Sequence, residues 1–175
     1  MVFHWVISKL GHTKKWQRKE YMVFQKNSYM LLSWLCQRLV DINTGTIAEC
    51  TRQNGHFWQL FIAHSFSIQG FLMGCQHVIT IDLTHLSGPY KGSLFSTTTY
   101  DVNDGMLPIA FGVVSSKNYE DWLWFLQKLK GILQDKEVVI ISYRHQVILC
   151  SVSQLFGVKN RAYCYRHVKE NFKYQ

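Results

Sequence analysis

The chain has 175 residues, of which 47% are hydrophobic and 15% aromatic, so it is long enough for one packed domain with a helical appendage, and disorder is excluded. No apolar run approaches the roughly 18 residues that a membrane helix needs. The first seven residues contain a histidine and lack a cleavage-site pattern, so no signal peptide and an intracellular protein are expected.

The net charge of +8 is concentrated at the two ends. Residues 1–40 hold seven Lys and Arg against one acid, residues 157–175 hold five against one, and residues 41–156 carry a net charge of −2. Two basic ends around a mildly acidic centre favour the binding of a polyanion such as DNA. The alternative interpretation is an ordinary soluble surface with scattered lysines. The candidate DNA contacts are Lys14, Lys15, Arg18, Lys19, Arg166 and Lys169. Aromatic residues between the N-terminal ones suit base stacking or burial equally well.

The five cysteines are scattered and form no Cys-x-x-Cys pair. Reduced, mostly buried thiols are therefore expected, in agreement with the nucleus or cytoplasm.

The N-terminal region, residues 1–72, is predicted to be basic and partly helical. A helix is expected over residues 27–40, because Leu31, Trp34, Leu35 and Leu39 fall on one helical face. Turn residues follow at 41–45, and residues 46–50 and 57–63 are predicted to be extended.

Residues 73–175 are predicted to form the core. Strands are expected over residues 78–82, 93–100 and 107–114, with a hairpin turn at 103–105. Pro108 places the third strand at a sheet edge or its proline at a strand start.

A helix capped by Asn118 follows, with an apolar stripe from Trp122 to Leu133. The nearly all-apolar residues 138–142 are typical of a buried parallel strand. A helix over 145–156, a short strand over 162–164 and a basic helix over 166–173 complete the core. The order β-β-β-α-β-α-β-α predicts an α/β, ribonuclease H-like, mixed five-stranded sheet of order 3-2-1-4-5. Its second strand is antiparallel, and helices flank it.

Asp82 ends the first core strand and is the candidate metal ligand. In a ribonuclease H-like enzyme, such a carboxylate and a second one on the neighbouring fourth strand hold two divalent metals that activate phosphodiester cleavage. A lone Asp at a strand end is otherwise a turn or capping residue.

Several stretches along the chain, which match a known family in the same order, support the interpretation of Asp82 as a metal ligand. They are residues 74–92 (GCQHVITIDLTHLSGPYKG), 101–111 (DVNDGMLPIAF), 119–126 (YEDWLWFL) and 162–167 (AYCYRH) with Asn171 and Phe172. Upstream stretches at 34–35, 43–46 and 61–71 add to them. Together they resemble plant Mutator-like (MULE) transposases of the MuDR type. The resemblance covers about residues 20–175 and implies a DDE catalytic core that uses Mg²⁺ or Mn²⁺ to cleave and transfer DNA strands.

Two departures from the family pattern decide the expected activity. Tyr143 stands where the resemblance places the second aspartate, and a phenol with a pKa near 10 is neutral at pH 7 and a poor Mg²⁺ ligand. The third acid of the family lies beyond the Cys-x-x-His stretch and is absent from the sequence given, so a truncated core is expected. With one of three acids, Asp82, the expected state is a non-catalytic remnant that binds no metal productively.

Other acids and a zinc-like pair are weaker candidates. Asp101 or Glu120 could act as a second metal ligand beside Asp82 in a residual nuclease. The alternative for Glu120 and Asp121 is that they are acids that stabilise the N-terminus of a helix through its dipole. Cys164 and His167 have zinc-ligand spacing but no second pair nearby, and a packed thiol with a surface histidine is the alternative.

The sequence thus predicts a nuclear, degenerate transposase fragment with weak, nonspecific DNA affinity and no membrane association. A transposase-derived transcriptional regulator and a residual metal-dependent nuclease are the alternatives.

Overall fold

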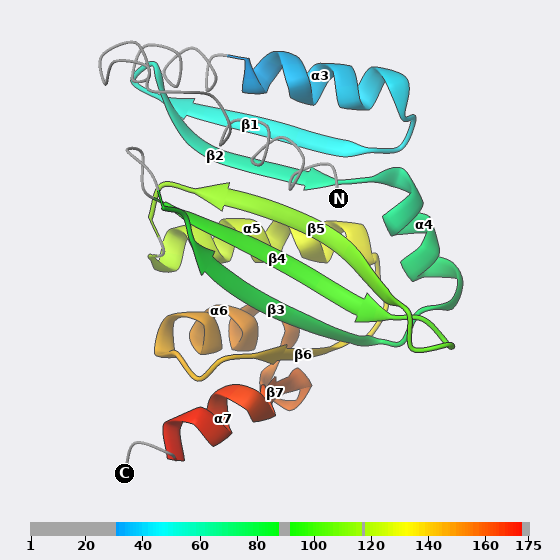
Figure 1. Cartoon of the computed structure of the whole chain (residues 1–175), viewed down its shortest axis with the longest axis vertical. Helices are drawn as coiled ribbons and strands as arrows, with labels where there is room; N and C mark the ends of the chain where they lie inside the picture. The colour runs from blue at the N-terminus through cyan, green and yellow to red at the C-terminus, as the bar shows by residue number, and fades with distance from the viewer. Residues whose placement is uncertain (1–30, 88–91, 117, 173–175) are drawn as a thin grey trace, which may run out of the picture.

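The computed structural model describes residues 31–87, 92–116 and 118–172, and its centre is one mixed β-sheet (Figure 1). Seven strands hydrogen-bond in the order β1-β2-β5-β4-β3-β6-β7. Their bounds are β1 (Ile47–Gln53), β2 (His56–Ala63), β3 (Val78–His85), β4 (Ser93–Tyr100), β5 (Met106–Val114), β6 (Val139–Ser142) and β7 (Arg161–Tyr163).

The strands run in two different ways on the two sides of β3. β3, β4 and β5 form an antiparallel meander, and the β1–β2 hairpin continues it because β2 pairs antiparallel with β5. On the other side, β6 pairs parallel with β3 and β7 parallel with β6. The carboxyl ends of β3, β6 and β7 therefore meet at one edge of the sheet.

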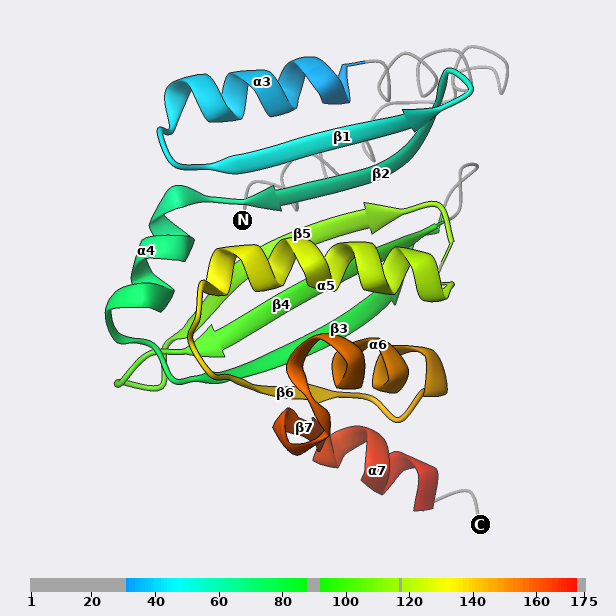
Figure 2. The same cartoon turned by 180° about the vertical axis from the view of Figure 1, so that it is seen from behind.

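The helices are α3 (Leu32–Ile42), α4 (Ser65–Gly74), α5 (Tyr119–Leu133), α6 (Gln146–Phe156) and α7 (Tyr165–Phe172), with a short 3-10 turn at Val158–Asn160. Figure 2 shows α5 and α6 side by side across one face of the sheet, with α3 along β1. Alternate residues of β2 face opposite ways: Phe61 packs with α5, whereas Ile62 packs with α3. No helix among the described residues is long and apolar enough to cross a membrane.

The main core lies between the sheet and α5. Phe95 of β4 stacks on Trp122 with ring centroids 3.9 Å apart, and Phe125 fills the space beside them. The close approach of α5 depends on Gly112, because a Cβ at this position would lie 2.6 Å from the Phe125 ring. The stripe from Trp122 to Leu133 is buried as predicted, and Asn118 caps the helix by accepting a hydrogen bond from the Asp121 amide.

The core elements follow their predicted places, but the sheet has seven strands rather than five because β1 and β2 join it. Of the two expectations for Pro108, the sheet edge is wrong, since β5 lies between β2 and β4, whereas the strand start agrees with the position of Pro108 as the third residue of β5. β5 tolerates the proline because β2 pairs only with residues 111–114, and the register to β4 shifts between Thr97 and Thr98, opposite Pro108.

Three further expectations need correction. In α3, Leu39 of the predicted stripe packs against the sheet, but Leu31 and Trp34 are more than 60% exposed, and Leu32 and Cys36 pack in their place. The helix α4 was not predicted. All five thiols are free as expected, but only Cys36 is fully buried, and this burial raises its pKa to about 11.

Candidate functional site

Asp82 lies in β3 on the sheet face opposite to α5. Its neighbours in the strand, Ile81 and Leu83, point into the core, and the alternation of a strand turns Asp82 to the other side. The Asp82 side chain is 46% exposed, pairs across the sheet with Ser96, and accepts the Leu83 amide through Oδ1 at 2.9 Å. The carboxylate is therefore accessible to solvent and held by its own strand.

Tyr143 directly follows β6, the parallel neighbour of β3. Its ring is partly buried against the core, and burial together with the Asp82 charge raises the pKa of this phenol above 10. The structure thus brings Tyr143 to the same end of the sheet as Asp82, where the phenol is neutral at neutral pH.

Aromatic and imidazole rings surround Tyr143. Its ring centroid lies 6.3 Å from that of Trp122, and 5.9 Å from those of His145 and His167. The buried nitrogens Nε1 of Trp122 and Nδ1 of His167 have no hydrogen-bond partner among the described residues. Tyr143 thus stands among rings, and among residues 31–87, 92–116 and 118–172 no observed contact joins a second carboxylate to Asp82.

Helix α7 places the positively charged side chain of Arg166 near Asp82. Arg166 Nη2 lies 3.8 Å from Asp82 Oδ2, and the two side chains are 66% and 46% exposed, so this ion pair is a weak surface contact. The backbone anchors the start of the helix, because the Cys164 amide donates to the Ser142 carbonyl at 2.9 Å. Arg166 and Lys169 are exposed on α7, whereas Lys14, Lys15, Arg18 and Lys19 lie outside the described residues.

Cys164 and His167 flank the start of α7 and are both partly buried. Within residues 31–87, 92–116 and 118–172, no three His, Cys, Asp or Glu side chains are grouped so as to hold a metal ion. His167 packs its ring near Tyr143 instead.

Asp101 is separated from Asp82 along the sheet. It follows β4 five residues beyond Ser96, the partner of Asp82, which corresponds to about 16 Å along the strand. Its Oδ1 accepts the amides of Asn103 and Gly105, both at 2.8 Å, and so closes the β4–β5 turn. This carboxylate shapes a hairpin at the opposite end of the strands.

Asp121 is the one fully buried acid among the described residues, with 1% exposure. It accepts Gln59 Nε2 at 2.7 Å and Ser116 Oγ at 2.5 Å, so it joins the start of α5 to β2. Asp121 was expected only as a favourable acid at a helix start, and this network was not predicted. Gln59, a lone amide between the apolar residues Trp58 and Leu60, was the available signal for a buried polar partner. Glu120, by contrast, is exposed.

One comparison with known proteins identifies the core. A protein-family model described as the MULE transposase domain matches residues 78–171, more than half of the chain, from β3 into α7. The matched span contains both Asp82 and Tyr143. A search of curated proteins gave no match. The chain therefore belongs to the MULE transposase domain family and is related to Mutator-like transposases.

Proposed function

We propose that this protein is a degenerate Mutator-like transposase core of plant origin that no longer cleaves or transfers DNA strands. The observation that carries the proposal is the neutral phenol of Tyr143 beside Asp82, at the strand end where the resemblance places the second carboxylate. The ancestral enzyme used Mg²⁺ or Mn²⁺ to activate a nucleophile and to stabilise the leaving oxygen of a phosphodiester.

The strand arrangement supports a ribonuclease H-like core for this domain. Strands β5-β4-β3-β6-β7 follow each other in the sheet, β4 runs antiparallel to β3, and β6 and β7 run parallel to it. In that arrangement the ends of β3 and β6 are where two metal-binding carboxylates would stand.

The residues at this place do not fit a pair of divalent metals. Mg²⁺ prefers anionic oxygens, and within the described part of the chain Asp82 is the one carboxylate that a contact places at this strand end. Tyr143 adds no negative charge at neutral pH, because burial and the Asp82 charge both raise its pKa. Arg166, 3.8 Å from the Asp82 carboxylate, adds a positive charge that opposes cation binding.

The remaining activity that we propose is weak, nonspecific DNA binding in the nucleus. Its support is the exposed basic side of α7, with Arg166 and Lys169, together with the basic residues 14–19 of the N-terminal region. A protein with this property and no cleavage activity would also suit the alternative role of a transposase-derived transcriptional regulator.

A plasmid-nicking assay tests the loss of cleavage. We expect supercoiled DNA to stay intact with the wild-type protein in Mg²⁺ or Mn²⁺, and the Asp82→Asn variant to behave identically. Nicking by the wild type that disappears in Asp82→Asn would refute the proposal and support the residual nuclease instead.

A gel-shift titration at low and high salt tests DNA binding separately. Phosphate contacts release counterions, so nonspecific binding should weaken steeply as salt rises. The Arg166→Gln/Lys169→Gln double variant should bind less tightly, while Lys136→Gln serves as a matched control on the loop after α5. Absence of a shift even at low salt would remove the DNA-binding proposal.

A further inference from the structure

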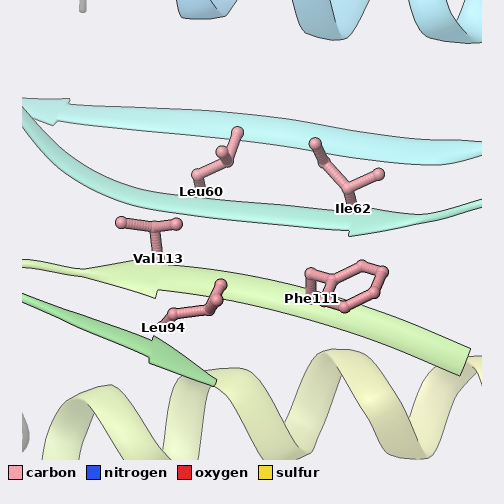
Figure 3. A pocket seen from close by; sticks show the side chains of 5 residues that line it. All are labelled: Leu60, Ile62, Leu94, Phe111 and Val113. Carbon is pink, nitrogen blue, oxygen red and sulfur yellow. The ribbon is translucent and has the colours of Figure 1, made fainter. Parts of the chain in front are cut away.

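Two free thiols, Cys36 and Cys50, belong to one small apolar cluster between α3 and the β1–β2 hairpin. Cys36 of α3 is buried together with Leu60 and Ile62 of β2, and Cys50 of β1 packs against this cluster. Figure 3 shows Leu60 and Ile62 on β2, where they also line an apolar pocket that extends to β5. Cys50 stands opposite Leu60 in the strand register, so its side chain lies on the same face of the sheet, towards α3.

The path of the chain brings the two cysteines to the same level. A short turn joins α3 to β1, and β1 runs back along the helix (Figure 1). Cys36 lies six residues before the last residue of α3, which corresponds to about 9 Å along the helix. Cys50 lies three residues after the first residue of β1, which corresponds to about 10 Å along the strand. The two side chains therefore lie at about the same distance from the turn.

The electrostatics of Cys36 also indicate that the two sulfur atoms are close. Burial raises the pKa of the Cys36 thiol to about 11, and the negative charge of an ionised Cys50 contributes to this rise. The interaction between two charges weakens as their separation grows, so Cys50 acts on Cys36 from nearby.

The two thiols differ in their access to dissolved molecules. Cys36 is 5% exposed, and its raised pKa keeps the thiol protonated at neutral pH. Cys50 is only partly buried, so a small oxidant reaches its sulfur first. Peroxides oxidise an accessible thiolate to a sulfenic acid, which condenses with a neighbouring thiol. Cys50 thus suits the first step and Cys36 the second.

We propose that Cys36 and Cys50 form a disulfide when the protein meets hydrogen peroxide, and that this bond fixes α3 to β1. The Cys50 thiolate attacks one peroxide oxygen: an S–O bond forms, the O–O bond breaks and hydroxide leaves. The Cys36 sulfur then attacks the sulfenic sulfur, so that an S–S bond forms, the S–O bond breaks and the oxygen leaves as water with the Cys36 proton. The peroxide is reduced and the two thiols are oxidised. This chemistry is independent of the Asp82 site.

Peptide mapping of the full chain tests the disulfide. The protein is treated with hydrogen peroxide, its remaining thiols are alkylated under denaturing conditions, and it is digested with trypsin. Cys36 falls in peptide 27–38 and Cys50 in peptide 39–52, so the disulfide joins two separate peptides. We expect this joined product from the wild type and its loss after reduction with dithiothreitol. It should be absent from Cys36→Ala and Cys50→Ser, whereas Cys150→Ser, which changes an exposed cysteine of α6, should keep it.

Thermal unfolding gives a second measurement. A disulfide that closes a loop over residues 36–50 should raise Tm by about 6–12 °C in the oxidised wild type and not in Cys50→Ser. The same oxidation in concentrated urea should give much less of the joined product, because unfolding separates α3 from β1.

Four outcomes would overturn the proposal. The first is an equal yield in urea, which would show that closeness in sequence rather than packing pairs the thiols. The second is a folded protein whose joined peptides contain other cysteine pairs instead. The third is Cys50 oxidised further to a sulfinic acid while Cys36 is recovered as an alkylated thiol. The fourth is that both thiols stay reduced at a peroxide concentration that oxidises the exposed Cys150.

Discussion

Replacement of Asp121 by alanine should destabilise the protein more than any other single change at an acid. The carboxylate is 1% exposed and accepts hydrogen bonds from Gln59 and Ser116. Asp121→Ala removes both bonds and leaves the buried Gln59 amide without its acceptor. The link between β2 and the start of α5 is thereby lost.

The two hydrogen bonds set the magnitude of the effect. Hydrogen bonds to an acidic side chain contribute about 1.5–3 kcal/mol each, and the variant no longer has the cost of burying the Asp121 side chain, so the net loss should be about 3–5 kcal/mol. For a chain of this length, 1 kcal/mol shifts Tm by about 2–4 °C, so Tm should fall by about 6–20 °C.

Urea denaturation at neutral pH measures the change in the free energy of unfolding. Glu120→Ala is the matched control, because it removes an exposed acid from the same helical turn and should cost about 0.3–1 kcal/mol. Asp121→Asn should fall between the two, since its amide keeps one acceptor and the Ser116 hydroxyl can accept instead of donate. Equal stability of Asp121→Ala and Glu120→Ala would refute the reasoning.

Three further predictions concern packing and pH. Gly112→Ala puts a Cβ 2.6 Å from the Phe125 ring and should cost about 1–3 kcal/mol in thermal unfolding, whereas Gly131→Ala, with open space around its Cβ, should be neutral or stabilising. Because the folded-state pKa of Tyr143 is raised above 10, the stability that it contributes is present below pH 10 and lost as pH rises further. A spectrophotometric titration should show a late-ionising phenol that is missing in Tyr143→Phe; identical curves would contradict this. Burial lowers the pKa of His64 below 6.5, so the stability that the neutral imidazole contributes is present above pH 6.5 and lost as pH falls. In His64→Gln, the urea concentration at the unfolding midpoint should therefore fall less between pH 7 and pH 5 than in the wild type. An equally steep decline in the variant would show that other groups are responsible.

Local patterns were sufficient for most elements of the core. The threonine-rich and aromatic-rich strand β4, the apolar stripe of α5 and the Asn118 cap were each predicted from residues close together in the sequence, and the structure confirms them. Only the sheet-edge expectation for Pro108 failed, because whether its strand is an edge depends on a distant partner. β2 passes β5 but pairs only beyond the proline, and nothing local to Pro108 reveals this.

The face on which α3 packs also depends on distant residues. The predicted apolar stripe of α3 consists of Leu31, Trp34, Leu35 and Leu39. The face that the helix packs against β2 instead includes Cys36 and Leu32. A helix with apolar residues on two sides satisfies the periodicity rule either way, so the choice is made by the surface that it meets.

For the candidate site, the sequence identified which residues stand at the two strand ends, whereas the side chains that contact them are seen only in the structure. The resemblance identified Asp82 and Tyr143, and parallel pairing of β3 with β6 brings their strand ends together. The approach of Arg166 and the ring of His167 against Tyr143 could not be predicted, because both depend on how α7 lies at the end of the sheet.

Titration calorimetry with Mg²⁺ and Mn²⁺ tests the central claim most directly, since it measures metal binding without requiring a DNA substrate. Wild-type protein and Asp82→Asn should give the same small heats of dilution at millimolar metal. Saturable heat from the wild type that is absent in Asp82→Asn would show that the residues around Asp82 do hold a metal, and the account of a degenerate core would be wrong.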